Sequence, residues 1–257
     1  MTGRTVLVTG GASGIGKATA ELFAAAGDFV AICDVDRPAG EALVQSLGAD
    51  NAMFCELDVS KEAAVAEAIG AIRCRRGSID VVFNNAGVAD ARPSVLDIDG
   101  AQFRRVHEVI VLGAMLVTKY AVPAMTGKGG AIINTTSVTA LRVSGGSAVY
   151  AAAKAGLRNY MQYAAVELGA LGIRVNSVCP GGVNTPLLRE SMGAGGDTIG
   201  ADIVAAGLCS TQVIQSATQP RDIAEAVFFL ASDAARATTG HDLVVDGGYV
   251  AANKGRA

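Results

Sequence analysis

Short apolar runs alternate with longer amphipathic segments along the whole chain. The runs with strand character cover residues 5–8, 29–33, 52–57, 79–83, 130–135, 173–178 and 242–245. The segments with helical periodicity cover about 18–26, 38–47, 61–76, 100–125, 149–170 and 221–231. Strands that alternate with helices predict a parallel sheet with helices on both faces. Because no linker, low-complexity tract or internal repeat interrupts this pattern, we predict one doubly wound α/β domain over residues 1–257.

A glycine-rich loop follows the first predicted strand. Residues 9–16 read TGGASGIG and lead into the first helical segment. Backbone N–H groups at the start of a helix, together with the helix dipole, form a binding site for a phosphate anion. Glycines at 10, 14 and 16 permit the tight turn and the close approach of a pyrophosphate. A plain strand-to-helix turn is the alternative, so the loop needs support from elsewhere in the chain.

That support comes from Asp34, directly after the second predicted strand. A dinucleotide-binding fold of the Rossmann type places a carboxylate roughly 20 residues beyond its last glycine, where it hydrogen-bonds the adenosine ribose. Asp34 fits this offset. Its charge would repel a 2′-phosphate, and Ser13 in the loop offers no cation to hold one. We therefore predict that the site binds NAD in preference to NADP. With the seven apolar runs, the predicted fold is a seven-stranded parallel Rossmann sheet.

Composition and charge exclude several other classes of protein. The net charge is −3 and the pI near 5.4, which argues against nucleic acid or an anionic membrane as a partner. No uninterrupted apolar run approaches the length of a membrane span, and we expect no signal peptide before the strand at residue 5. The five cysteines form no C-x-x-C pair and are typical of buried thiols in a reducing compartment. His107 and His241 have no neighbouring residues with the spacing of metal ligands, so we predict no bound metal. The thiols and the expected lack of a signal peptide predict a cytoplasmic protein.

Tyr150 and Lys154 lie four residues apart, on one face of a predicted helix. A cation beside a phenol favours the phenolate, which makes the tyrosine a usable proton donor and acceptor. Ser137 lies just beyond the strand 130–135, at the carboxyl end where open parallel sheets bind ligands. The pattern Y-x-x-x-K alone fits an exposed aromatic–lysine pair equally well. The position of Ser137 favours a catalytic site.

With these residues in place, the sequence resembles the short-chain dehydrogenase/reductase family over nearly its whole length. The motifs that carry the resemblance are the loop 9–16, Leu57-Asp58-Val59, Asn84-Asn85-Ala86-Gly87, Ser137 with Tyr150 and Lys154, the segment 180–185, and Asp246-Gly247-Gly248. Each motif is modest, but their order along the chain is specific. The resemblance implies a homotetramer with dihedral symmetry, formed by the two long helices and the last strand.

The resemblance also implies a role for each matching residue. Tyr150 would be the acid/base, Ser137 would orient the substrate oxygen, and Lys154 would also bind the nicotinamide ribose. The remaining cofactor contacts would be Gly10, Ser13, Gly14, Ile15 and Gly16 at the pyrophosphate, Asp34, Asp58, Val59, Asn85, Ala86 and Gly87 at the adenosine, and Pro180, Gly181, Val183 and Thr185 at the nicotinamide. The cofactor supplies the redox chemistry, and the protein aligns it and handles the proton.

One position departs from the family pattern. Ile110 stands where the family has an asparagine that helps to hold a water connecting the lysine to solvent. An isoleucine side chain cannot hold that water, although a backbone carbonyl there still could. A slower proton relay is the interpretation we favour, because Ser137, Tyr150 and Lys154 supply the direct acid/base groups. The alternative is an NAD-binding protein with little or no catalysis, such as a sensor of redox state.

A glycine-rich, apolar region at about 187–219 departs from the strand–helix rhythm, and we expect it to cover the substrate as a lid. Arg189 is its only cation. A phosphate or a coenzyme A ester would need more positive charge, so we predict a neutral, fairly apolar secondary alcohol or ketone as the substrate. The expected substrate contacts are Ser137, Gly182, Leu187, Leu188 and Met192.

Overall fold

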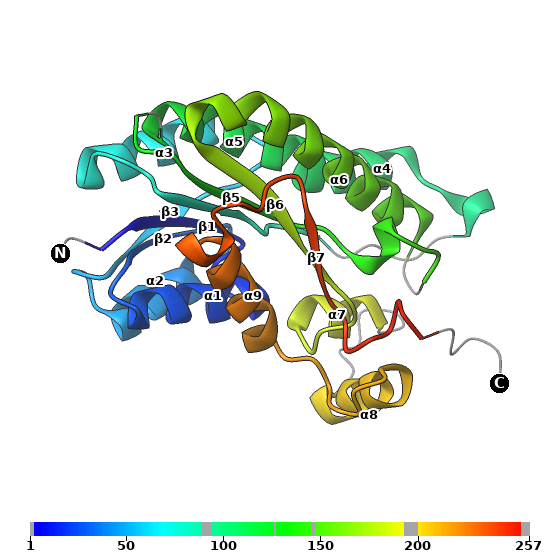
Figure 1. The fold of residues 1–257 in the computed structure, drawn as a ribbon. Helices are drawn as coiled ribbons and strands as arrows, with labels where there is room; N and C mark the ends of the chain where they lie inside the picture. Colours follow the sequence, from blue (N-terminus) through cyan, green and yellow to red (C-terminus); the bar gives the residue numbers. More distant parts are fainter. Residues whose placement is uncertain (1–2, 89–93, 126, 145–146, 193–199, 253–257) are drawn as a thin grey trace.

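A computed structural model describes residues 3–88, 94–125, 127–144, 147–192 and 200–252. Its centre is a seven-stranded parallel sheet with the strand order β3-β2-β1-β4-β5-β6-β7 (Figure 1). The strands are β1 Thr5–Thr9, β2 Phe29–Asp34, β3 Ala52–Glu56, β4 Val81–Asn84, β5 Gly130–Thr135, β6 Ile173–Pro180 and β7 Asp242–Val245. The predicted Rossmann fold with a seven-stranded parallel sheet is confirmed.

The strands are apolar on both faces because helices cover both. Alternate residues of one strand enter different cores: Leu7 belongs to one, while Val6 and Val8 belong to the other. Residues of β1 pair in register with β2 on one side and with β4 on the other, for example Leu7 with Ala31 and with Val82. Strands buried on both faces read as continuous apolar runs rather than alternating ones, which is why the sequence locates them so well.

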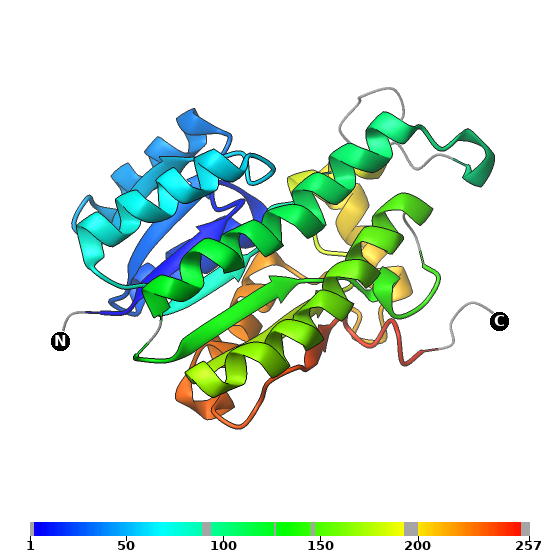
Figure 2. The same cartoon turned by 90° about the horizontal axis from the view of Figure 1, so that it is seen from above.

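The helices lie in two layers. The helices α1 (Gly14–Ala25), α2 (Arg37–Leu47) and α9 (Pro220–Leu230) cover one face of the sheet. The opposite face is covered by α3 (Glu62–Arg76), α4 (Gly100–His107), α5 (Gly113–Met125) and α6 (Ala148–Leu168), which lie across the sheet in Figure 2. Two further helices, α7 (Pro186–Met192) and α8 (Ala201–Thr211), lie apart from both layers (Figure 1).

Local chemistry fixes where the helices begin. The Asp36 side chain accepts a hydrogen bond from the Ala39 N–H at the start of α2, and Gln219 and Asp222 form a capping box at the start of α9. At the start of α6, the Ser147 hydroxyl accepts a hydrogen bond from the Tyr150 N–H at 3.0 Å. This cap places Tyr150 in the first turn of the helix.

Three expected elements differ from the structure. The expected helix 100–125 is divided by a π-helical turn, η2 (Glu108–Leu112), which contains Ile110. The strand expected at 79–83 begins later, at Val81, because the N–H groups of Ile79 and Asp80 donate to Ala124 and Thr5. The glycine-rich region 187–219, which departs from the strand–helix rhythm of the sequence, holds α8 and most of α7.

One helical segment, Gly100–Met125, is long and apolar enough to cross a membrane by length and composition alone. Its 18-residue window has a mean hydropathy of 1.5, but 56% of that window is buried inside the fold. A core helix that packs between the sheet and its neighbours has this composition for that reason.

Candidate active site

The glycine loop between β1 and α1 has a backbone shape that only small residues allow. Gly10 and Gly14 have φ angles of 61° and 51°, in the left-handed region that disfavours a side chain. A Cβ atom at Gly16 would lie 2.0 Å from the Gly10 carbonyl oxygen. The start of α1 is therefore bare of side chains at the place where a pyrophosphate would bind, so the loop fits a dinucleotide.

Thr9 and Asn85 hold this loop against the next strand in the sheet. The Thr9 hydroxyl accepts hydrogen bonds from the N–H groups of Asn85 and Ala86, at 2.9 and 3.1 Å. The Asn85 amide donates to the carbonyl oxygens of Thr9 and Gly10, both at 3.2 Å, and accepts from the Thr135 hydroxyl at 3.2 Å. Asn85 lines the cavity, as expected, but its polar atoms brace the loop. No local sequence pattern indicates this role.

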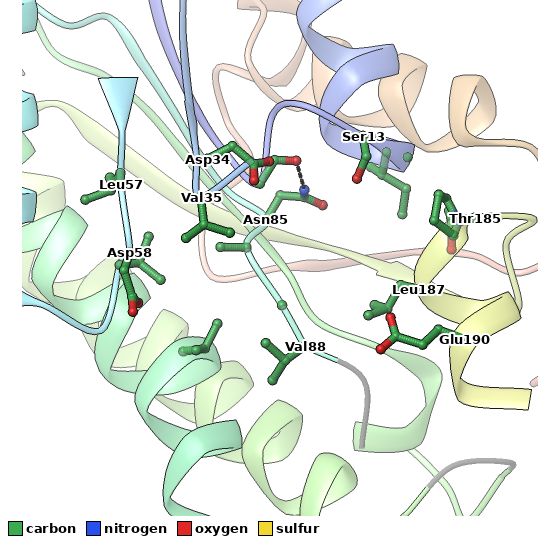
Figure 3. A pocket seen from close by; sticks show the side chains of 18 of the residues that line it. Ser13, Asp34, Val35, Leu57, Asp58, Asn85, Val88, Thr185, Leu187 and Glu190 are labelled. Carbon is green, nitrogen blue, oxygen red and sulfur yellow. Dashed lines mark hydrogen bonds between the residues drawn. The ribbon is translucent and has the colours of Figure 1, made fainter. Parts of the chain in front are cut away.

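A cavity of about 290 Å³ lies beyond the loop, on the adenosine side (Figure 3). It brings together most of the cofactor residues expected at the pyrophosphate and the adenosine: Gly10, Ser13, Gly14, Ile15, Asp34, Asp58, Val59, Asn85, Ala86 and Gly87. Thr185, expected at the nicotinamide, also lines this cavity. Gly16 is buried and does not line it. Leu57, Val88, Arg105 and Glu190 line the same cavity and were missed from the sequence, because they come from four separate segments.

The charges around this cavity are mostly negative. Asp34 accepts hydrogen bonds from the N–H groups of Ala12 and Asp36, at 2.9 and 3.0 Å, so it also fixes the glycine loop. Partial burial acts to raise the pKa of Asp58, but the hydrogen bonds from Ser60 and the nearby Arg105 outweigh it and hold that pKa below its usual value. Arg105 lies 3.6 Å from Asp58. The guanidinium is thus already paired.

A second cavity of about 530 Å³ adjoins the first and contains the expected catalytic residues. Ser137, Tyr150 and Lys154 line it together with Pro180, Gly181, Gly182, Val183, Leu187 and Leu188. The Ser137 hydroxyl accepts a hydrogen bond from the Thr139 N–H at 3.2 Å, which leaves its proton free to point at a substrate oxygen. The Lys154 Nζ lies 5.5 Å from the centre of the Tyr150 ring. Met192 ends α7, but its side chain lies outside the described residues.

Lys154 is a buried cation. Its exposed fraction is 3%, and its Nζ donates to the Thr135 carbonyl oxygen at 2.6 Å. Burial lowers the pKa of Lys154 from 10.5 to about 8, because the charged form loses hydration. The lysine therefore carries its proton at neutral pH but releases it in mildly alkaline solution.

The segment 180–185 passes close to two other parts of the fold. A Cβ atom at Gly181 would meet Asp246 at 2.8 Å, and one at Gly182 would meet the Leu208 side chain at 2.2 Å. The Gln212 amide donates to the Gly182 carbonyl oxygen at 3.2 Å. Leu208 and Gln212 belong to α8 and to the residue that follows it, so this helix packs directly over the expected nicotinamide segment.

Ile110 is fully buried in the π-helical turn, packed with residues of α4, α5 and α6. A small cavity of about 10 Å³ beside it is also lined by Asn84, whose buried Oδ1 has no hydrogen-bond partner among the described residues. π-Helical turns are frequent at functional sites. In this chain the turn carries Ile110 and no asparagine. Within the described residues, no group of three or more His, Cys, Asp and Glu side chains is placed to hold a metal ion.

Fold and site together define a dinucleotide-binding α/β protein with a hydroxyl, a phenol and an ammonium at one cavity. A family model described as enoyl-(acyl carrier protein) reductase matches residues 10–250. The chain belongs to the short-chain dehydrogenase/reductase family, a family of nicotinamide-dependent oxidoreductases.

Several characterised relatives align over almost the whole chain. The chain is 41% identical to cis-4-hydroxycyclohexanecarboxylate dehydrogenase of Sinomonas cyclohexanicum, covering 96% of this chain and 97% of the relative. It is 36% identical to secoisolariciresinol dehydrogenase of Forsythia intermedia, covering 98% and 90%. It is 39% identical to (−)-isopiperitenol/(−)-carveol dehydrogenase of Mentha piperita, covering 96% and 94%.

Proposed function

We propose that this protein transfers a hydride between NAD(H) and a neutral, fairly apolar secondary alcohol or ketone. The observation that carries the proposal is the convergence of Ser137, Tyr150 and Lys154 on one cavity, next to a loop shaped for a pyrophosphate. A bound nicotinamide supplies or accepts the hydride. The residues of the chain then have to orient the substrate oxygen and move one proton.

Tyr150 is the proposed acid/base at the substrate oxygen. During oxidation it accepts the alcohol proton, and during reduction it donates a proton to the carbonyl oxygen. Ser137 donates a hydrogen bond to the same oxygen and holds it against the phenol. The Lys154 ammonium favours the phenolate and, as in related enzymes, is proposed to bind the ribose hydroxyls of the nicotinamide.

The charges of the adenosine-side cavity support NAD over NADP. The carboxylates of Asp34, Asp58 and Glu190 line it, whereas Arg105, the guanidinium that lines it among the described residues, is paired with Asp58. A 2′-phosphate would add negative charge beside these carboxylates, while a ribose hydroxyl can donate to Asp34.

The substrate class rests on the second cavity. Apolar side chains from α7 and α8, among them Leu188, Val204 and Leu208, close one side of this cavity. Their position supports our proposal that the chain is one domain, 1–257, with a lid at about 187–219. Apart from Lys154, the residues that line this cavity in the described part of the chain carry no charge. The name of one relative, cis-4-hydroxycyclohexanecarboxylate dehydrogenase, specifies a hydroxyl group on a six-membered ring, and a cyclic secondary alcohol fits the same chemistry here.

We also propose a homotetramer in the cytoplasm. Tyr163 and Val166 on the outer side of α6 are 66% and 83% exposed, and Phe103 on α4 is 42% exposed. Large apolar side chains left in water on two neighbouring helices favour association between copies of the chain.

The experiment that tests the function is a screen of cyclic and aliphatic secondary alcohols with NAD, following the formation of NADH. Turnover of at least one alcohol is expected. If fluorescence shows that NADH binds but no alcohol or ketone is turned over, the alternative is supported. In that alternative, suggested by Ile110, the protein is a sensor of redox state. Tyr150→Phe should abolish the expected turnover, whereas the control Tyr120→Phe, which removes a hydroxyl that donates to Glu62 at 3.0 Å, should not.

A further inference from the structure

Among the residues that the structure describes, two buried hydroxyl groups in the wall of the larger cavity have no hydrogen-bond partner. These are the Thr139 Oγ1 and the Ser144 Oγ, and both residues line the cavity that contains Ser137 and Tyr150. A buried hydroxyl without a partner costs about 1–3 kcal/mol, so native proteins keep few of them unless a ligand or another function requires them.

The neighbouring hydroxyls of the same segment are all satisfied within the protein. Ser137 accepts from the Thr139 N–H, Ser147 accepts from the Tyr150 N–H, and Thr136 donates to the Val178 carbonyl oxygen. Thr211, elsewhere on the wall of this cavity, donates to carbonyl oxygens of its own helix at 3.1–3.3 Å. The lack of partners is thus confined to Thr139 and Ser144 among these hydroxyls.

The wall that carries the two hydroxyls is held firmly in place. The short helix η3 (Val138–Ala140) and the turn after it are closed by hydrogen bonds from the N–H groups of Leu141 and Arg142 to the Val138 carbonyl oxygen, at 3.0 and 3.1 Å. The Arg142 guanidinium donates to the Val250 carbonyl oxygen at 3.3 Å and lies 5.5 Å from the centre of the Tyr249 ring. A wall anchored in this way presents its hydroxyls in a fixed geometry, which reduces the entropy lost when a ligand binds.

The rest of the cavity restricts the ligand that could satisfy these groups. Leu188, Val204 and Leu208 form an apolar side, and the described lining residues other than Lys154 are uncharged. A serine or threonine hydroxyl can both donate and accept, so it can bind a hydroxyl or a carbonyl oxygen. Away from Lys154 the described lining residues offer no cation, so an anionic group there would be desolvated without a partner.

We propose that Thr139 and Ser144 form a second polar subsite, which binds a hydroxyl or carbonyl oxygen of the substrate remote from the carbon that is oxidised. The preferred substrates are then neutral ring compounds with two oxygen functions joined by a hydrocarbon frame, such as diols and hydroxyketones. The inference rests on the proposed function, because it places the reacting oxygen at Ser137 and Tyr150.

The test compares substrates that differ only in the second oxygen. Oxidation of cyclohexane-1,2-, 1,3- and 1,4-diol and of the matching methylcyclohexanols is measured as kcat/KM for the wild type and for Thr139→Val, Ser144→Ala and the double variant. One neutral hydrogen bond is worth about 0.5–1.5 kcal/mol. We therefore expect the wild type to prefer its best diol by about tenfold or more. Each single variant should lower that preference roughly threefold to tenfold, with little change for the methylcyclohexanols.

Thr211→Val is the matched control, since it removes a hydroxyl of the same cavity that is already bonded to backbone. It should leave the preference for the diol unchanged. Equal kcat/KM for diols and methylcyclohexanols in the wild type would overturn the inference while leaving the proposed function intact, and so would variants that slow both substrates alike.

Failure to oxidise any of these alcohols would contradict the proposed function rather than the subsite. Binding then decides the inference: dissociation constants of 4-hydroxycyclohexanone and 4-methylcyclohexanone are measured on the NADH complex by calorimetry. Tighter binding of the hydroxyketone, lost in Ser144→Ala and Thr139→Val, supports the subsite. Equal binding of the two ketones rejects it.

Discussion

Replacing the buried lysine by an apolar side chain of similar length should make the protein inactive and, at neutral pH, more stable. The Lys154 ammonium is withdrawn from water and makes one hydrogen bond, to the Thr135 carbonyl oxygen. Its pKa falls from 10.5 to about 8 on folding. Because one pKa unit is worth about 1.36 kcal/mol, the charged form costs the folded state about 3 kcal/mol.

The sign of this effect changes with pH. Below pH 8 the lysine is charged in both the folded and the unfolded chain, so the full cost is present. Between about pH 8 and 10.5 only the unfolded chain keeps the proton, and the free energy of unfolding of the wild type therefore rises with pH. Lys154→Met removes the charge but leaves the Thr135 carbonyl oxygen without its partner, at a cost of about 1–3 kcal/mol.

The expected result is a crossover. At pH 7 the Lys154→Met protein should be more stable by about 1 kcal/mol, which raises Tm by about 2–4 °C for a chain of this size. At pH 10 the wild type should be the more stable of the two. Urea unfolding of both proteins without cofactor, at one protein concentration, measures the difference, and the titrating groups that do not interact with Lys154 cancel.

Lys128→Met provides the control, because Lys128 is exposed and its Nζ contacts only the Ser78 hydroxyl among described residues. Its stability difference from the wild type should stay within about 0.5 kcal/mol at both pH values. A Lys154→Met protein that is less stable than the wild type at pH 7, or a difference that does not change between pH 7 and 10, would refute the reasoning.

Three further predictions concern the cofactor, the π-helical turn and the assembly. Asp34→Ala should weaken NAD binding and bring the kcat/KM values with NAD and NADP closer together. It removes a ribose partner, a repulsive charge and the acceptor of the Ala12 N–H. A wild type that uses NADP as well as NAD would contradict the proposed preference for NAD. Ile110→Asn should raise kcat by less than about tenfold, since a relay group one step from the proton transfer contributes less than the 10²–10⁴-fold of a direct one. The asparagine amide of this variant would lie beside the Asn84 Oδ1, which has no partner among the described residues, so urea unfolding should show little loss of stability. An unchanged kcat would reject the proton relay at position 110 but not the proposed role of Tyr150. Light scattering at micromolar concentration should give the mass of four chains, and a stable monomer would rule out the tetramer.

The strands and the motif residues could be predicted because their signals are local. Apolar runs on both faces mark parallel strands, and a spacing of four residues places Tyr150 and Lys154 on one side of a helix whichever way it packs. The glycines at 10, 14 and 16 are required by the backbone path itself, as the contact between a Cβ at Gly16 and the Gly10 carbonyl shows.

Other features depend on tertiary contacts that leave no local trace. A π-helical turn has nearly the same apolar pattern as an α-helix, so the turn around Ile110 could not be distinguished from its neighbours. The brace between Thr9 and Asn85 joins strands that are adjacent in the sheet but distant in the chain. Glycines in the region 187–219 masked α7 and α8, whose position over Gly182 comes from packing.

The measurement that tests the central claim most directly is turnover by Tyr150→Phe. With one good secondary alcohol and saturating NAD, kcat should fall by at least about 10²-fold, the range expected for a positioned acid/base. NADH binding, measured by fluorescence on the same preparation, should stay within about threefold of the wild type, because the phenol does not hold the pyrophosphate or adenosine. A Tyr150→Phe protein that oxidises the alcohol as fast as the wild type would contradict the mechanism proposed here.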